Sequence, residues 1–210
     1  MNKLGDLSCN EFLTELASAA PAPGGGGGAA MAGALAAALA SMVANLTIGK
    51  EKFAECEPEV KELLKQAEAE RVRLLTLVDE DAAVFNSFMS CYKLPKTTDE
   101  EKAARTAAIR AAAKQAATVP LNIARSSFAV LKLADMLVVS GNPGVITDGA
   151  CSGLLARAAL RCAEYNVRIN LGLTKDEVWN AQATADLKQL LADAEALETR
   201  LLAVTDKALQ

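Results

Sequence analysis

One aspartate of this chain lies on the apolar face of a predicted helix, where a carboxyl group can transfer protons. Within the predicted helix 57–92, spacings of three and four place five residues on one stripe: Leu74, Leu77, Asp81, Val84 and Phe88. A carboxylate among apolar side chains is costly unless it is paired or functional, and burial raises its pKa toward values useful for acid–base catalysis. Asp81 is therefore a candidate catalytic residue. The alternative is a structural role, as a salt bridge or a helix-end hydrogen bond inside the core.

A run of five glycines is the second feature that could bind a ligand. Pro21-Ala22-Pro23 stiffens the approach, and Gly24 to Gly28 let another group come close to bare backbone N–H groups. A helix that begins just after the glycines would direct its free N–H groups and positive dipole end at that group. A flexible linker is the alternative, and the run matches neither a Walker A loop nor a dinucleotide-binding fingerprint. The residues expected to contact an anionic or polar ligand are Pro23, Gly24, Gly25, Gly26 and Gly27.

Four further polar residues each have an ordinary structural explanation. Lys50 is the first positive charge after the glycines and could meet an anionic group, although a cation is favoured at a helix C-terminus in any case. Asp148 lies in the first turn of a predicted helix, where acidic residues complement the dipole. Asn142 belongs to the turn SGNPG, and Asn170 belongs to NVRINL, where it can satisfy local backbone groups.

Several classes of chemistry are excluded by composition. The 210 residues include no histidine, which removes the usual proton shuttle, the commonest metal ligand and every Ser-His or Cys-His arrangement. We therefore expect no metal. The formal net charge of −4 shows no bias toward nucleic acid or an anionic membrane.

The elements that must position these residues are predicted to be helices of a single domain, 1–210. Capping boxes that begin at Ser8, Thr98 and Thr174 indicate three helix starts. Turn residues indicate the other boundaries, with Pro120 opening the fifth helix and 166–171 as a short extended piece in the alternative reading. The core must be built from Ala, Leu and Val, since 51% of residues are hydrophobic but only 4% are aromatic. Such a core favours an all-α bundle. The predicted helices span 9–20, 28–49, 57–92, 98–117, 120–139, 147–164 and 174–208.

The second helix lacks a polar face. No charge occurs between Glu15 and Lys50, and the segment is long enough to span a bilayer. Its composition of Ala and Gly, with Ser41, Asn45 and Thr47 inside, instead favours a buried central helix of a protein that does not enter the membrane. Seven helices can hardly cover it completely, so we expect a symmetric dimer. The N-terminus has no signal-peptide pattern, and we expect a cytoplasmic protein.

The chain also resembles a known family. PAPGGGGGAAMAGALAAALASMVANLTIGK is similar to the PTPGGGS-led helix of the formiminotransferase-cyclodeaminase C-terminal domain and of its stand-alone relatives, the methenyltetrahydrofolate cyclohydrolases. The likeness continues, in order, through LVDEDAAVF, YKLPK with its following EEK, VPL, SGN, TDGA and NVRINL. Two departures matter: Gly27 replaces the serine that follows the family's glycines, and TDGA, which contains Asp148, reverses the last two residues of the family's SDAG.

This resemblance implies an all-helical homodimer with a folate site near the subunit interface and no metal or redox cofactor. It implies chemistry on the carbon that bridges N5 and N10 of tetrahydrofolate, with Asp81 moving protons and Asp148 as the next acid–base candidate. The resemblance makes Asn142, Asp148 and Asn170 candidate partners for the pterin edge. The glycines would contact the pterin, the aminobenzoyl ring or a tail carboxylate. Lys50 would meet the anionic tail, which in polyglutamylated folates carries several glutamates.

Two reactions and one rival remain open. We favour hydrolysis of 5,10-methenyltetrahydrofolate to 10-formyltetrahydrofolate, because the sequence contains no formiminotransferase domain. The alternative is a cyclodeaminase that releases ammonia from 5-formiminotetrahydrofolate. The rival, motivated by Gly27, is a non-catalytic helical dimer that retains folate binding.

Overall fold

The computed structural model describes residues 3–210 and contains only helices and their connections within that range. The all-α expectation is confirmed. Six α-helices are accompanied by three short 3-10 turns, Leu4–Asp6, Glu51–Phe53 and Pro143–Val145. The α-helices are α1 (Cys9–Leu16), α2 (Gly25–Asn45), α3 (Glu57–Cys91), α4 (Asp99–Ser140), α5 (Ile146–Thr174) and α6 (Glu177–Ala208).

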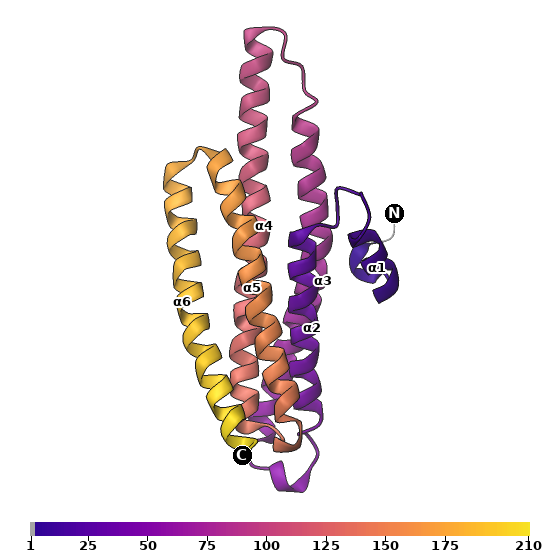
Figure 1. Cartoon of the computed structure of the whole chain (residues 1–210), viewed down its shortest axis with the longest axis vertical. Coiled ribbons are helices and arrows are strands. Elements are labelled where there is room, and N and C mark those ends of the chain that lie inside the picture. The colour runs from indigo at the N-terminus through magenta and orange to yellow at the C-terminus, as the bar shows by residue number, and fades with distance from the viewer. Residues whose placement is uncertain (1–2) are drawn as a thin grey trace.

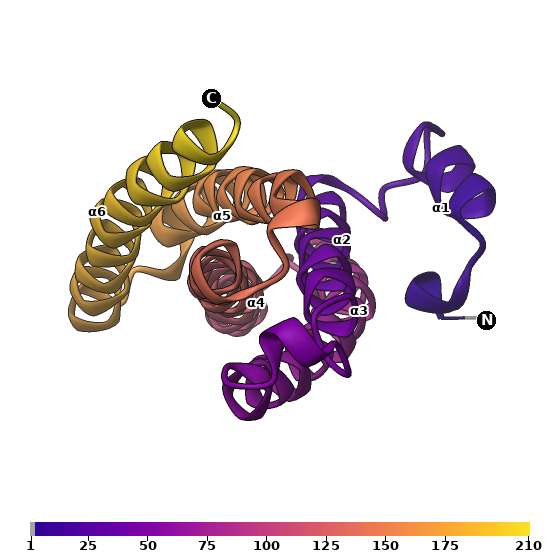
Figure 2. The ribbon, with the colours of Figure 1, turned by 90° about the horizontal axis from the view of Figure 1, so that it is seen from below.

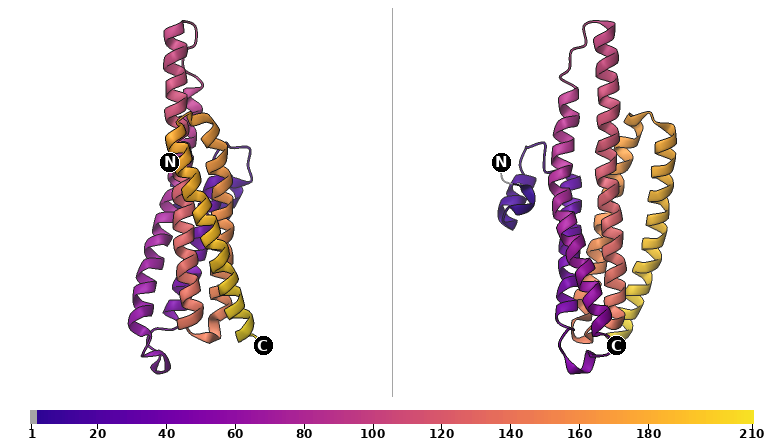
Figure 3. Two further views of the ribbon diagram at one scale, coloured as in Figure 1. Left: turned by 90° about the vertical axis from the view of Figure 1, so that its left-hand side faces the viewer. Right: turned by 180° about the vertical axis from the view of Figure 1, so that it is seen from behind.

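Five of the helices form an elongated bundle. Helices α2 to α6 run alongside one another, while α1 lies to one side of them (Figure 1). Seen end on, α4 lies in the angle between α5 and the α2–α3 pair, while α2 and α5 also contact each other directly (Figure 2). Helix α6 packs against both α4 and α5. The hairpin of α3 and α4 extends beyond the ends of the other helices, as the side views show (Figure 3). Helix α2 therefore begins beside the middle of this hairpin, and the candidate site lies where it begins.

The main correction to the predicted elements concerns Pro120. Instead of starting a new helix, Pro120 lies inside α4, so the segments predicted as 98–117 and 120–139 form one helix and the described residues hold six α-helices, not seven. A proline within a helix lacks an N–H and leaves the carbonyl four residues earlier without its usual donor. Here that carbonyl, Ala116 O, accepts a hydrogen bond from Asn170 Nδ2 of α5 at 2.9 Å.

Other boundaries shift for local reasons. The glycine run does not precede α2 but forms its first turn, with Gly24 as the N-cap and Gly28 N donating to Gly24 O at 2.9 Å. Residues 166–171 are helical, because α5 continues to Thr174. The capping boxes that begin at Ser8 and Thr98 are confirmed. At α6 the cap is Asp176 rather than Thr174, since the Asp176 side chain accepts from Trp179 N.

Small side chains let α2 pack closely against its neighbours. Ala30, Ala36, Ala37 and Ala40 are fully buried, and α3, α4 and α5 all contact this helix. Among residues 3–210, α2 is the one helix long and apolar enough to cross a membrane, but most of it is buried in the bundle, which is typical of a core helix. In this single chain α2 is not covered on every side.

Candidate active site

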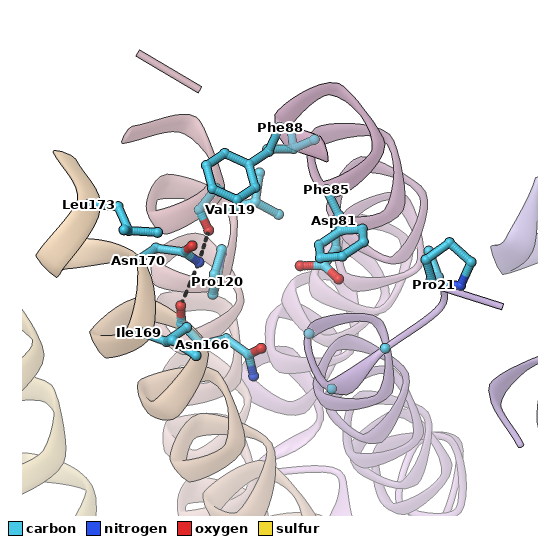
Figure 4. Close-up of a pocket in the computed structure, with 16 residues that line it drawn as sticks. Pro21, Asp81, Phe85, Phe88, Val119, Pro120, Asn166, Ile169, Asn170 and Leu173 are labelled. Atoms are coloured by element: carbon cyan, nitrogen blue, oxygen red, sulfur yellow. Dashed lines mark hydrogen bonds between the residues drawn. The ribbon is translucent and has the colours of Figure 1, made fainter. Parts of the chain in front are cut away.

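A cavity of about 310 Å³ opens beside the N-terminus of α2. Four helices and the proline-containing approach to α2 surround it, and Figure 4 shows side chains from α3, α4 and α5 converging on it. Its lining combines one carboxylate, two asparagines, three glycines and a majority of apolar residues. The lining residues are Pro21, Ala22, Gly24, Gly25, Gly26, Asp81, Val84, Phe85, Phe88, Ala116, Val119, Pro120, Asn166, Ile169, Asn170 and Leu173.

The carboxyl group of Asp81 lies directly against the first turn of α2. The predicted stripe on α3 is confirmed, because Leu74, Leu77 and Phe88 are buried and Asp81 is half-buried between them. The approach of α2 is so close that a side chain at Gly26 would overlap the carboxyl group, since an added Cβ would lie 2.6 Å from Asp81 Oδ2. Glycine at this position therefore allows the helix terminus and the carboxylate to meet.

The backbone of α2 and the burial of Asp81 act on its pKa in opposite directions. Desolvation raises the pKa of the Asp81 carboxyl above its ordinary value and is the larger effect, while a backbone hydrogen bond from Gly27 lowers it. The N–H groups of a first helical turn have no acceptor within the helix, and they form its positive dipole end. The Asp81 carboxyl therefore binds a proton more firmly than an exposed aspartate does. The neighbouring backbone N–H groups of the first turn of α2 can still donate to a polar atom of a ligand.

Helix α5 forms the opposite wall through two asparagines. Asn166 Nδ2 donates to Cys162 O at 2.9 Å, and an added Cβ at Gly25 would lie 3.5 Å from the same nitrogen. Asn170 Nδ2 donates to both Asn166 O and Ala116 O, each at 2.9 Å. These bonds fix the two amides at the depth of the α2 terminus (Figure 4).

Aromatic and aliphatic side chains form the rest of the cavity. Phe85 and Phe88 follow Asp81 by one and two turns on α3, and Ile169 and Leu173 face them from α5 (Figure 4). Phe88 is 8% exposed, whereas Ile169 is 72% exposed and stands at the surface. The site is therefore a polar end at α2 continued by an apolar slot, which suits a ligand with a polar heterocycle and an aromatic ring.

The structure brings part of the predicted site together. Gly24, Gly25, Gly26, Asp81 and Asn170 all line the cavity. Pro23 and Gly27 are buried immediately behind it, where an added Cβ at Gly27 would lie 3.3 Å from Pro23 Cβ and 4.0 Å from Asp81 Oδ2.

Three predicted residues lie at the other end of the bundle of the same chain. Lys50 follows the C-terminus of α2, about 30 Å along that helix from the glycines. Asp148 lies in the first turn of α5, about 27 Å along the helix from Asn166. The Asn142 side chain is used in the turn before α5, where it donates to Leu46 O and accepts from Gly144 N. Within one chain these three residues do not join the cavity.

Several lining residues were not proposed from the sequence. Phe85 and Phe88 could have been found, because they follow Asp81 at i+4 and i+7 on one helix face. Asn166 and Ile169 were hidden by the expectation that α5 ends at 164. Among residues 3–210, no group of three or more His, Cys, Asp or Glu side chains is arranged to hold a metal ion.

Comparisons with known proteins find similar sequences over most of this chain. A sequence model of the family described as formiminotransferase-cyclodeaminase matches residues 8–189. The methenyltetrahydrofolate cyclohydrolase of Methylorubrum extorquens is 44% identical over 197 residues, which cover 94% of this chain and 95% of that protein. The formimidoyltransferase-cyclodeaminase of Sus scrofa is 33% identical over 183 residues, which cover 87% of this chain but only 34% of that longer protein.

A solved structure shares the whole fold. The crystal structure of formiminotetrahydrofolate cyclodeaminase from Thermotoga maritima superimposes with a TM-score of 0.88 and 29% sequence identity, covering 98% of each chain. The helical architecture, the family match over most of the chain and the full-length relative lead to one conclusion. This chain belongs to the formiminotransferase-cyclodeaminase family.

Proposed function

We propose that this protein is a folate one-carbon enzyme that hydrolyses 5,10-methenyltetrahydrofolate to 10-formyltetrahydrofolate. The observation that carries the proposal is the position of Asp81, the one charged residue among the described residues that line the cavity, at the glycine-formed terminus of α2. The full-length relative named methenyltetrahydrofolate cyclohydrolase supports the choice of reaction.

The cavity suits the charge and shape of this substrate. The methenyl carbon between N5 and N10 carries positive charge, which a carboxylate at close range stabilises electrostatically. The pterin offers N–H and carbonyl groups to the two asparagine amides and to the N–H groups of α2, and the aminobenzoyl ring fits between Phe85 and the α5 side chains.

Asp81 acts first as a base and then as an acid. Water attacks the methenyl carbon, a C–O bond forms, and the Asp81 carboxylate takes a proton from that water to give a neutral tetrahedral carbinolamine. Asp81 then returns the proton to N5 as the C–N5 bond breaks, and the hydroxyl proton leaves to solvent as the formyl C=O forms. One water is consumed and one proton is released. A raised pKa suits this role, because the carboxyl must accept and donate near neutral pH.

Cyclodeamination is the second candidate reaction, because the pig relative and the Thermotoga maritima structure carry that name. In that reaction N10 attacks the carbon of the protonated 5-formimino group, and Asp81 moves the N10 proton to the departing nitrogen. The C–N bond to that nitrogen breaks, ammonia leaves, and the cationic 5,10-methenyl group forms. Both reactions pass through a tetrahedral carbon that bears N5, N10 and a third heteroatom. Neither requires a redox cofactor or a metal, and we propose that the enzyme uses none.

We also propose a cytoplasmic homodimer formed through α2 and α5. Apolar side chains remain exposed on both of these adjacent helices: Leu35 and Met42 on α2, and Leu154 and Tyr165 on α5. A second copy that covers them would complete the burial of the uncharged helix α2.

An absorbance assay tests the proposed function. The purified protein is mixed with 5,10-methenyltetrahydrofolate at a pH where spontaneous hydrolysis is slow, and the loss of methenyl absorbance is compared with that of Asp81→Asn. We expect rapid loss with the wild type and a decrease of roughly 10²-fold or more with the variant. Ammonia release from 5-formiminotetrahydrofolate would identify the cyclodeaminase, and folate binding without either turnover would identify a non-catalytic dimer.

A further inference from the structure

An aromatic ladder leads from the cavity toward the tip of the α3–α4 hairpin. Phe88 lines the cavity, and its ring packs edge to face on Tyr92, with centroids 5.3 Å apart and an interplanar angle of 83°. Phe88 is buried, whereas Tyr92 is 42% exposed. The two rings therefore connect the interior of the cavity with the surface along α3.

An arginine ends this ladder. The guanidinium carbon of Arg105 on α4 lies 5.5 Å from the centroid of the Tyr92 ring, and Arg105 Nη2 donates to Tyr92 O at 3.2 Å. These contacts hold the guanidinium group in place. Arg105 Nε is buried and has no hydrogen-bond partner within residues 3–210.

Arg105 differs from most arginines of the chain because it has no carboxylate partner among the described residues. Six of the nine pair with a carboxylate, and Arg105 does not pair with any within the described range. A buried donor without an acceptor costs free energy, and a guanidinium group presents its donors in a planar fork that matches a carboxylate. Arg105 is partly exposed, and a ligand carboxylate at the accessible side of the guanidinium group would pair with its charge.

The position of Arg105 fits the length of a folate. Tyr92 lies about 16 Å along α3 from Asp81. In the substrate, an aminobenzoyl ring and an amide bond separate the reacting carbon from the glutamate carboxylates. A substrate with its one-carbon unit at Asp81 and its ring beside Phe85 would place its carboxylates farther along α3, beyond Phe88 and toward Arg105.

We propose that Arg105 binds a carboxylate of the glutamate tail of the substrate and sets the preference for glutamylated folates. This inference rests on the proposed function and extends it to the far end of the ligand. It also assigns the anionic tail to a cation other than Lys50, which lies at the opposite end of α2. Arg105 is a binding residue and does not contact the reacting carbon.

The test compares a charged tail with a neutral one. 5,10-Methenyltetrahydrofolate and its glutamate dimethyl ester, which keeps the shape but removes both charges, are assayed with the wild type, Arg105→Met and Arg105→Gln. Methionine retains much of the apolar stem, and glutamine retains a donor for Tyr92 O. The control is Arg110→Met, since Arg110 is an exposed arginine on the same helix outside the ladder.

We expect both Arg105 variants to raise KM for the diacid by roughly 10- to 100-fold with kcat unchanged, and to leave KM for the diester unchanged. The control should leave both values unchanged. Equilibrium dialysis with tetrahydrofolate and its diester should show the same dependence on charge. A lower melting temperature with equal KM changes for both substrates would assign Arg105 a structural role at the C-terminus of α3 and overturn the proposal.

The two proposals fail in different ways. A wild-type protein that neither hydrolyses nor binds the methenyl compound refutes the proposed function. A wild-type protein that hydrolyses it, together with Arg105 variants that match it on the diacid, refutes only the tail site.

Discussion

The substitution Gly26→Ala tests the site with a single methyl group. An added Cβ at this position would lie 2.6 Å from Asp81 Oδ2 and would overlap the rest of the carboxyl group, whereas ordinary contacts begin at 3.4 Å. Either the carboxyl must rotate away or the first turn of α2 must shift. In both cases the carboxyl and the helix terminus separate by about 1 Å.

The size of the effect follows from this displacement. A misplacement of about 1 Å in a catalytic group can reduce turnover by roughly 10²-fold, which corresponds to about 2.7 kcal/mol of transition-state stabilisation. Helix propensity acts in the other direction, because alanine is favoured over glycine by about 0.5–1 kcal/mol within a helix. We therefore expect Gly26→Ala to lose activity while keeping the fold.

The matched control is Gly28→Ala. It adds the same methyl group to the same helical turn, but its nearest neighbour would be Leu16 Cδ2 at 3.9 Å, an ordinary contact. Methenyl hydrolysis and thermal melting are measured for both variants and the wild type. The control should keep wild-type activity, and both variants should melt within a few degrees of the wild type.

One result would refute this reasoning. If Gly26→Ala hydrolysed the methenyl compound at the wild-type rate, the close approach of Asp81 to the α2 terminus would not contribute to catalysis. Equal losses in Gly26→Ala and Gly28→Ala would instead show that activity depends on the flexibility of the glycine run.

Three further predictions concern the same end of the bundle. Asp81→Asn should raise the melting temperature at pH 7 although it lowers turnover. Burial raises the pKa of the Asp81 carboxyl in the folded state, so the ionised carboxylate lowers the stability of the wild type above the ordinary pKa of aspartate. Thermal melts at decreasing pH should therefore show a shrinking difference in melting temperature between the variant and the wild type. Gly27→Ser should place a hydroxyl within reach of Asp81 Oδ2, lower the pKa of that carboxyl and move the acid limb of the pH–rate profile to lower pH; an unmoved limb would contradict this. Asn170→Ala should leave Ala116 O without its donor and destabilise the fold by roughly 1–3 kcal/mol in urea titrations, and unchanged stability would show that another group replaces the amide.

The sequence predicted those features that depend on residues close together in the chain. The stripe that carries Asp81 is a property of one helix, and its spacing determines which side chains face the core. The capping boxes at Ser8 and Thr98 are likewise local, because side chain and backbone lie three residues apart. The association of a helix start with the glycine run is also local, although the helix begins within the run rather than after it.

The features that could not be predicted depend on contacts between helices. A proline normally interrupts a helix, and the amide of Asn170, fifty positions after Pro120, supplies the donor that the Ala116 carbonyl of the continuous α4 lacks. The distance of Lys50, Asn142 and Asp148 from the cavity also depends on how the helices pack. Local patterns show which residues are polar or near a helix end, but they do not show which ends share one side of the bundle.

The same hydrogen bond connects the stability of the fold to the geometry of the site. Because Pro120 lacks an N–H, α4 has one free carbonyl at the depth of the cavity, and Asn170 bonds to it. That bond fixes α5 relative to α4, and α5 in turn carries Asn166, whose amide lies against Gly25. Asp81 approaches the adjacent glycine, Gly26, from α3, so α3 and α5 meet α2 at two consecutive glycines. A fully regular α4 would offer no such anchor, and the irregular residue that misled the helix prediction is therefore part of what aligns the walls of the site.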